Sequence, residues 1–99
     1  MTDAEANGGA GGVRRRVAIA NRRGLHARAA AKFVKTAEGF AATVRVRRNG
    51  VEVGGDSIMG LMMLAAGPGT EIEIEATGDD AAAVLEALVA LVERKFDED

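Results

Sequence analysis

The sequence predicts an α+β fold in which helices cover one face of an antiparallel sheet. Apolar and charged residues alternate in four short segments, which is typical of half-buried strands. Between these segments, apolar residues recur at the spacing of one helix face. The pair Asn49-Gly50 lies between two alternating segments and favours a hairpin, because a type I′ turn needs positive φ at both central positions.

The order of the elements follows from the points where the periodicity changes. Gly39 is a typical helix stop, and Ser57 is a good N-cap for the short apolar segment that follows it. Asp79 or Asp80 is expected to cap the last helix. In chain order, we expect a strand at 13–19, a helix at 27–38, strands at 43–48 and 51–53, a helix at 58–64, a strand at 71–76 and a final helix.

Apolar stripes identify the helix faces that become buried. The stripe of the first helix is Ala30, Phe33, Val34 and Ala37, and that of the last helix is Val84, Leu85, Leu88, Leu91 and Val92. An antiparallel sheet with helices on one face buries both stripes and leaves its other face in water. The folded domain is expected over 13–96, with a disordered tail at 1–12 and a solvated acidic end at 97–99.

The composition excludes several kinds of site. The chain has 99 residues, 47% of them hydrophobic and 28% charged, and a formal net charge of -2, so no overall attraction to nucleic acid or membrane is expected. It has no cysteine and one histidine, which excludes disulfides and cysteine or multi-histidine metal sites within the chain. We recognise neither a membrane helix nor a signal peptide, and we expect a cytoplasmic location.

The single histidine, His26, lies where a strand segment gives way to a helix segment. Gly24 can supply the turn into the helix, which would place His26 at a helix N-terminus, where unpaired amides and the helix dipole favour an anion. Arg28 adds a guanidinium with two-pronged phosphate geometry. These positive groups oppose protonation of the ring, so we expect a mostly neutral imidazole with one nitrogen free to attack a phosphoryl group.

The segment Gly24-Leu25-His26-Ala27-Arg28 resembles the active-site segment of the HPr family, the histidine-containing phosphocarriers of the bacterial phosphotransferase system. The similarity continues through 30–34, 56–64 and 71–75. It implies an open-faced β-sandwich with strand order 1-4-2-3 and three helices on one face. It also implies a monomeric carrier without cofactor or metal, not a stand-alone enzyme. In such a carrier, Enzyme I would phosphorylate His26 on Nδ1 using phosphoenolpyruvate, Arg28 would neutralise the phosphate, and EIIA-type proteins would receive it.

Two positions depart from the family pattern. Ala29 stands where the family has proline; because alanine is a good helix former, we expect the helix to persist and the transfer rate to change. This variant resembles the nitrogen-related regulatory branch of the family more than the sugar-uptake branch. Ser57 matches the serine that HPr kinase/phosphorylase modifies, but Asp56 replaces the lysine that often precedes it, and its carboxylate would repel a new phosphate.

The resemblance further implies a docking surface around His26 that combines basic and apolar side chains: Arg28, Lys32, Lys35, Ile58, Met59 and Met62. A helix at 58–64 is too short to bury all its sides, so part of its methionine-rich surface should stay exposed and suit several partners. A phosphoserine at Ser57 would add negative charge to this surface. It should then hinder transfer from Enzyme I, whose docking surface is acidic in the family.

Other interpretations of these residues stay open. A lone histidine most often has no chemistry, and Ser57 can be a cap alone. A non-catalytic module that binds a small ligand or RNA would need a glycine-rich phosphate loop or exposed strand aromatics, and the sequence shows neither. An independent hydrolase is disfavoured because no second acid or base is evident near His26. The strand arginines are expected to face Glu71, Glu73 and Glu75 and not nucleic acid.

Overall fold

The fold is described from a computed structural model over residues 12–98. The tail expected at 1–12 lies outside the described residues except for Gly12, and so does Asp99. The predicted order of strands and α-helices is confirmed, and a short 3-10 helix follows it. The elements are β1 (Val13–Ala18), α2 (Ala27–Glu38), β2 (Thr43–Arg48), β3 (Val51–Gly54), α3 (Ile58–Met63), β4 (Glu71–Thr77), α4 (Ala81–Glu93) and η1 (Lys95–Asp97).

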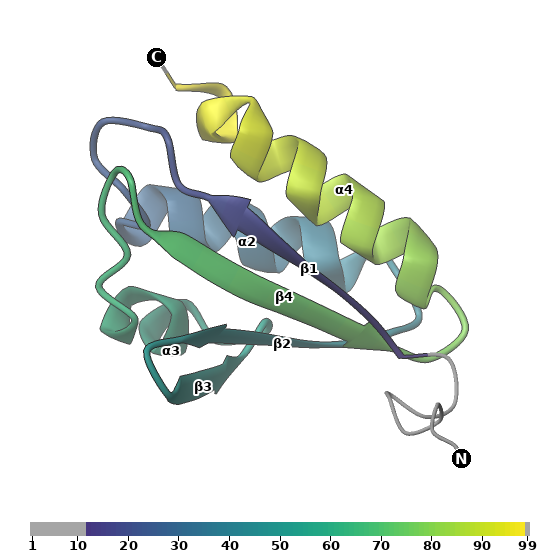
Figure 1. The fold of residues 1–99 in the computed structure, drawn as a ribbon. Helices are drawn as coiled ribbons and strands as arrows, with labels where there is room; N and C mark the ends of the chain where they lie inside the picture. Colours follow the sequence, from purple (N-terminus) through teal and green to yellow (C-terminus); the bar gives the residue numbers. More distant parts are fainter. Residues whose placement is uncertain (1–11, 99) are drawn as a thin grey trace.

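The strands form one four-stranded antiparallel sheet in the order β1-β4-β2-β3. The predicted order 1-4-2-3 is therefore confirmed. Figure 1 shows α2 behind the sheet and α4 running alongside β1, with α3 beside the β2–β3 hairpin. The same view brings the loop that follows β1 close to the C-terminal end of the chain, although these segments lie far apart in the sequence.

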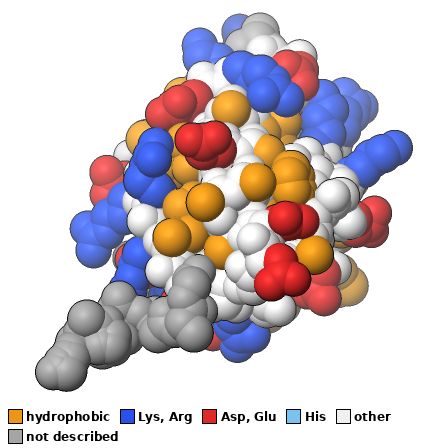
Figure 2. Space-filling view, turned by 90° about the vertical axis from the view of Figure 1, so that its right-hand side faces the viewer, with side chains coloured by type: hydrophobic (Ala, Val, Ile, Leu, Met, Phe, Trp, Pro, Cys, Tyr) orange, Lys and Arg blue, Asp and Glu red, His pale blue; other side chains and the backbone are white. Residues whose placement is uncertain are grey.

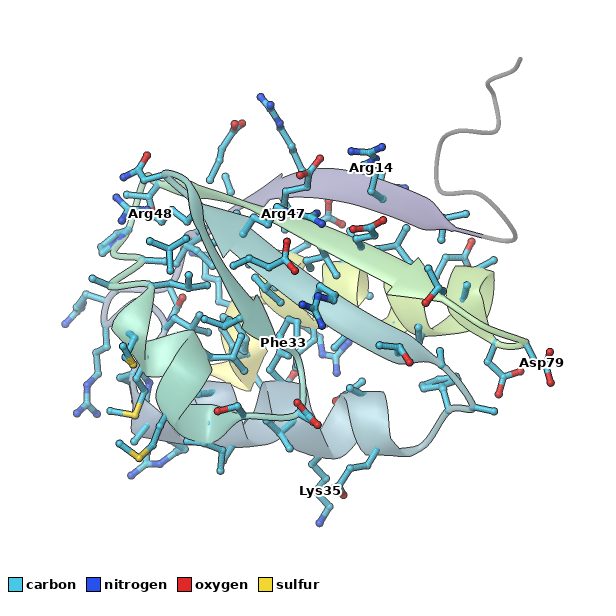
Figure 3. All side chains as sticks on the ribbon, turned by 90° about the horizontal axis from the view of Figure 1, so that it is seen from below. Arg14, Phe33, Lys35, Arg47, Arg48 and Asp79 are labelled. Atoms are coloured by element: carbon cyan, nitrogen blue, oxygen red, sulfur yellow. The ribbon has the colours of Figure 1, made fainter. Side chains whose placement is uncertain are left out.

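The core lies between the sheet and the helices. All the residues of both predicted helix stripes are buried there, with Ala29 added on α2. Figure 3 shows the Phe33 side chain pointing from α2 into the molecule and Lys35 pointing away from it. Burial of this apolar surface against the sheet holds α2 in place, and α2 in turn carries His26 at its N-terminal end.

Several element ends differ by one residue from the sequence expectation, and the cap of α4 differs as well. Asp80 occupies the N-cap position of α4 but its side chain makes no capping bond. Its carboxylate instead accepts a hydrogen bond from the Ala41 N–H at 2.7 Å, and so ties the start of α4 to the loop before β2. β1 ends at Ala18, one residue early, although Ile19 is fully buried and its N–H donates to the Thr70 carbonyl at 2.8 Å.

The turn before His26 depends on Gly24, which has φ of +66°. The next residue, Leu25, donates its N–H to the Ala66 carbonyl at 2.9 Å. A Cβ at Gly24 would lie 2.5 Å from that carbonyl oxygen and 2.9 Å from the Gly67 Cα. Only glycine combines this conformation with such a close approach of two backbones.

Gly24→Ala should therefore destabilise the protein by about 1–3 kcal/mol, because the new methyl group clashes with backbone and the left-handed conformation is strained. Urea denaturation measures the change. Gly67→Ala is the matched control: its φ is not positive and a Cβ there meets nothing within 4 Å. Equal unfolding midpoints for the two variants would contradict this account of the turn.

Candidate functional site

His26 is the N-cap of α2, as its place in the sequence suggested. Its carbonyl accepts a hydrogen bond from the Ala30 N–H at 2.8 Å, and its ring atom Nδ1 accepts one from the Arg28 N–H at 3.3 Å. The ring thus satisfies one of the amides that a helix start leaves without an intrahelical partner. This arrangement aims Nδ1 at the positive end of a 12-residue helix.

The other ring nitrogen of His26 meets a residue that sequence analysis missed. Nε2 lies 2.6 Å from the Glu98 carboxylate, and only 17% of the His26 side chain and 14% of the Glu98 side chain are exposed. Residues 97–99 were expected to form a solvated acidic end, and for Glu98 this expectation is wrong. Burial alone would raise the pKa of the Glu98 carboxyl, but hydrogen bonds with His26 and Asn21 outweigh it, so the net pKa is lowered.

Glu98 is held by its own set of contacts. The fully buried Asn21 donates its amide N–H groups to the Glu98 carboxylate at 3.1 Å and to the Gly24 carbonyl at 2.8 Å. Phe96, also fully buried, anchors η1 in the core. The Lys32 ammonium donates to the Phe96 carbonyl at 2.7 Å. A large apolar residue just beyond the α4 stripe was the one sequence signal that the end of the chain packs back onto the fold.

Arg28 lies two residues after His26 and is exposed. Its backbone N–H contacts His26, whereas its guanidinium forms no ion pair with any of the residues 12–98. A guanidinium without a carboxylate partner keeps its fork of N–H donors available for a carboxylate or phosphate.

Ser57 is the N-cap of α3, as predicted. Its hydroxyl oxygen accepts a hydrogen bond from the Gly60 N–H at 2.9 Å. The side chain is half-buried and the neighbouring Asp56 is exposed. A cap made of a single hydroxyl contributes about 1 kcal/mol to the stability of the fold, so Ser57 has a structural role whether or not it is modified.

The residues predicted for docking fall into two groups. On α3, the apolar side chains are exposed as expected, at 40% for Ile58, 73% for Met59 and 43% for Met62. Met63, which was not predicted for docking, is as exposed as Met59. On α2, Lys35 points into solvent, whereas Lys32 is half-buried and engaged with the chain end.

The charged side chains of the open sheet face pair with one another. Arg14 and Arg47 both form ion pairs with Glu73, and Arg47 also pairs with Glu75. The hydrogen bond to Glu75 raises the pKa of Arg47 above its usual value. Figure 3 shows Arg14 and Arg47 on this outer face. Figure 2 shows the side of the molecule that lies to the right in Figure 1, where acidic and basic side chains are interspersed around apolar ones. These pairs neutralise the sheet arginines locally.

Residues 12–98 carry neither a metal-binding cluster nor a membrane-spanning helix. That part of the chain contains no group of three potential metal-ligating side chains. Its helices are all too short or too polar to cross a lipid bilayer.

Comparisons with known proteins agree with this geometry. Residues 13–94 match the family model of the PTS HPr component phosphorylation site. The chain is 48% identical over 86 residues to phosphocarrier protein HPr of Neisseria meningitidis, covering 87% of this chain and 97% of that protein. It is 45% identical over 86 residues to phosphocarrier protein NPr of Proteus mirabilis, covering 86% of this chain and 96% of that protein. The crystal structure of HPr-C-His from Thermoanaerobacter tengcongensis matches with a TM-score of 0.84 at 40% identity, covering 88% of this chain and 98% of that one.

The family match spans β1 to the end of α4 and includes His26, Arg28 and Ser57. The matches to related sequences and to the solved structure each cover most of this chain and nearly all of the matched protein. The chain therefore belongs to the HPr family and is a phosphocarrier protein of the HPr/NPr type.

Proposed function

We propose that His26 accepts a phosphoryl group from phosphorylated Enzyme I and passes it to EIIA-type proteins. The observation that carries the proposal is the position of the ring: Nδ1 faces the first turn of α2, 3.3 Å from the Arg28 N–H. In the transfer, the Nδ1 lone pair forms a bond to phosphorus while the bond between phosphorus and the donor breaks, and the donor atom keeps that electron pair.

The surroundings of Nδ1 suit the product of this step. Once Nδ1 is bonded to phosphorus it no longer accepts the Arg28 N–H, and this amide becomes a donor to a phosphoryl oxygen at a helix N-terminus. The exposed guanidinium of Arg28 adds a second, charged donor. α2 starts at Ala27 although Ala29 replaces the family's proline. The amide donors of the first turn are therefore in place without the proline ring.

We propose the exposed side chains of α3, together with Arg28 and Lys35, as the docking surface for these partners. Ile58, Met59, Met62 and the previously overlooked Met63 give it an apolar, adaptable centre. The basic side chains would meet acidic partners and steer the encounter. Lys32 contributes less than expected because its ammonium already donates to the Phe96 carbonyl.

Ser57 is proposed as a regulatory phosphorylation site of HPr kinase/phosphorylase. Its hydroxyl lies at the start of α3, beside the apolar docking side chains, so a phosphate there would add two negative charges to the docking surface. The Asp56 carboxylate next to it would weaken recognition by the kinase. The identities to HPr and NPr relatives are similar and favour neither the sugar-uptake nor the nitrogen-related branch. We place the carrier in the cytoplasm, as a monomer.

His26→Asn tests the phosphoryl-acceptor role. Asparagine is an effective N-cap, so α2 should keep its start while the nucleophilic ring is lost. Native protein incubated with Enzyme I and phosphoenolpyruvate should gain an acid-labile phosphate, and incorporation into the variant should fall to background. Thermal unfolding checks that the variant is folded. A non-covalent binding module would instead leave native protein unlabelled, and labelling of the variant would assign the phosphate to another residue.

Ser57→Asp tests the blocking model. Aspartate also caps helices, so the change adds charge to the docking surface while preserving α3, and Ser57→Asn is the neutral control with the same shape. Phosphoryl transfer from Enzyme I to Ser57→Asp should slow by about tenfold at low salt and recover as salt screens the charge. The control should transfer at the native rate. If Ser57→Asp is as fast as Ser57→Asn, charge at this position does not block docking.

A further inference from the structure

We propose that Glu98 is a positioning residue that selects which ring nitrogen of His26 reacts. The inference deepens the proposed phosphoryl-acceptor function and depends on it. A neutral imidazole carries its proton on one nitrogen and keeps a lone pair on the other, and only the nitrogen with the lone pair can attack phosphorus. The protein must therefore fix the tautomer before transfer.

Both ring contacts require the same tautomer. The Arg28 N–H can only donate, so Nδ1 must accept and must be unprotonated. The Glu98 carboxylate can only accept, so Nε2 must carry the proton and donate to it at 2.6 Å. The Nδ1 contact is long, at 3.3 Å, and includes one neutral amide, whereas the Nε2 contact is short and charge-assisted. Glu98 thus contributes most of the preference.

Asn21 fixes the direction of this hydrogen-bond chain. The Gly24 carbonyl is an acceptor, so the atom of Asn21 that faces it must be the amide nitrogen, and the same nitrogen faces the other oxygen of Glu98. The Asn21 amide oxygen has no hydrogen-bond partner among residues 12–98, so no contact of this oxygen opposes the orientation that the two donations require. Both oxygens of Glu98 then act as acceptors, one toward Asn21 and one toward His26.

The backbone conformation of the residues before Glu98 positions this carboxylate. Lys95, Phe96 and Asp97 all have positive φ, at 61°, 55° and 61°, a conformation that costs non-glycine residues free energy. Such strain persists only when other contacts hold it, and here burial of Phe96 and the bond from Lys32 to its carbonyl do so. The strained turn after α4 brings Glu98 onto the ring.

The transfer step needs no proton movement in this arrangement. When Nδ1 bonds to phosphorus, the ring becomes a cation that keeps its proton on Nε2, and the facing Glu98 carboxylate offsets the new positive charge. Since charge develops next to a preplaced counter-charge in a partly buried site, the step is favoured in the transition state as well as in the product. Phosphoryl release to the next acceptor reverses the same changes.

Glu98→Gln is the variant that tests the proposal, because it puts a hydrogen-bond donor where the carboxylate accepted the Nε2 proton. The glutamine oxygen would accept the Asn21 N–H, which leaves the glutamine amide N–H facing Nε2 and favours a proton on Nδ1. Asp97→Asn is the matched control: it removes the neighbouring carboxylate, which is 54% exposed and pairs with Arg94, without touching the ring. The chain's single histidine makes selective ¹⁵N labelling of the ring unambiguous.

The ¹⁵N shifts of the unphosphorylated protein, taken near pH 8.5 where an ordinary imidazole is neutral, report the tautomer directly. Native protein and Asp97→Asn should show the proton on Nε2, and Glu98→Gln should shift the population toward Nδ1. Acceptance of phosphate from Enzyme I should slow about tenfold in Glu98→Gln and stay native in the control.

A native tautomer or a native rate in Glu98→Gln would overturn the role of Glu98 while leaving the phosphocarrier function intact. Native protein that accepts no phosphate would overturn the proposed function instead, and the ¹⁵N shifts would still decide the tautomer. Thermal unfolding of all variants separates loss of the fold from loss of the contact.

Discussion

Two segments of the chain contact the His26 ring, and the proposed chemistry depends on both contacts. One of them joins His26 to Glu98, which lies 72 residues further along the sequence. On one side, the first turn of α2 supplies an amide to Nδ1; on the other, the end of the chain supplies a carboxylate to Nε2. Each segment is fixed by apolar burial, α2 through Phe33 and the chain end through Phe96. The hydrophobic core therefore sets the geometry of a site that is built from polar groups.

Features determined by nearby residues were predictable. The strands, the hairpin at Asn49-Gly50, the bounds of α2 and the cap at Ser57 all follow from patterns a few residues long. The position of His26 at the start of α2 was predictable as well, because Gly24 can supply the turn into the helix. The strand order was predicted from family resemblance, since periodicity alone does not state which strands are neighbours.

Features that depend on long-range packing were missed. Nothing local distinguishes Glu98 from the acidic residues beside it; its role requires the turn in which Lys95, Phe96 and Asp97 adopt positive φ, and such a turn has no glycine signal here. The hydrogen bond of Lys32 was missed for the same reason, because its partner, the Phe96 carbonyl, is distant in the sequence. Family resemblance did not help, since the motifs that carry it end at residue 75.

The central claim is that Nδ1 of His26, held free of a proton at the start of α2, carries the phosphoryl group. Phosphorylating ¹⁵N-histidine-labelled protein with Enzyme I and phosphoenolpyruvate, then measuring the coupling between ³¹P and each ring nitrogen, tests it most directly. The structure predicts a one-bond coupling to Nδ1 while Nε2 keeps its proton. A one-bond coupling to Nε2, or a phosphate that shows coupling to neither nitrogen, would contradict the account.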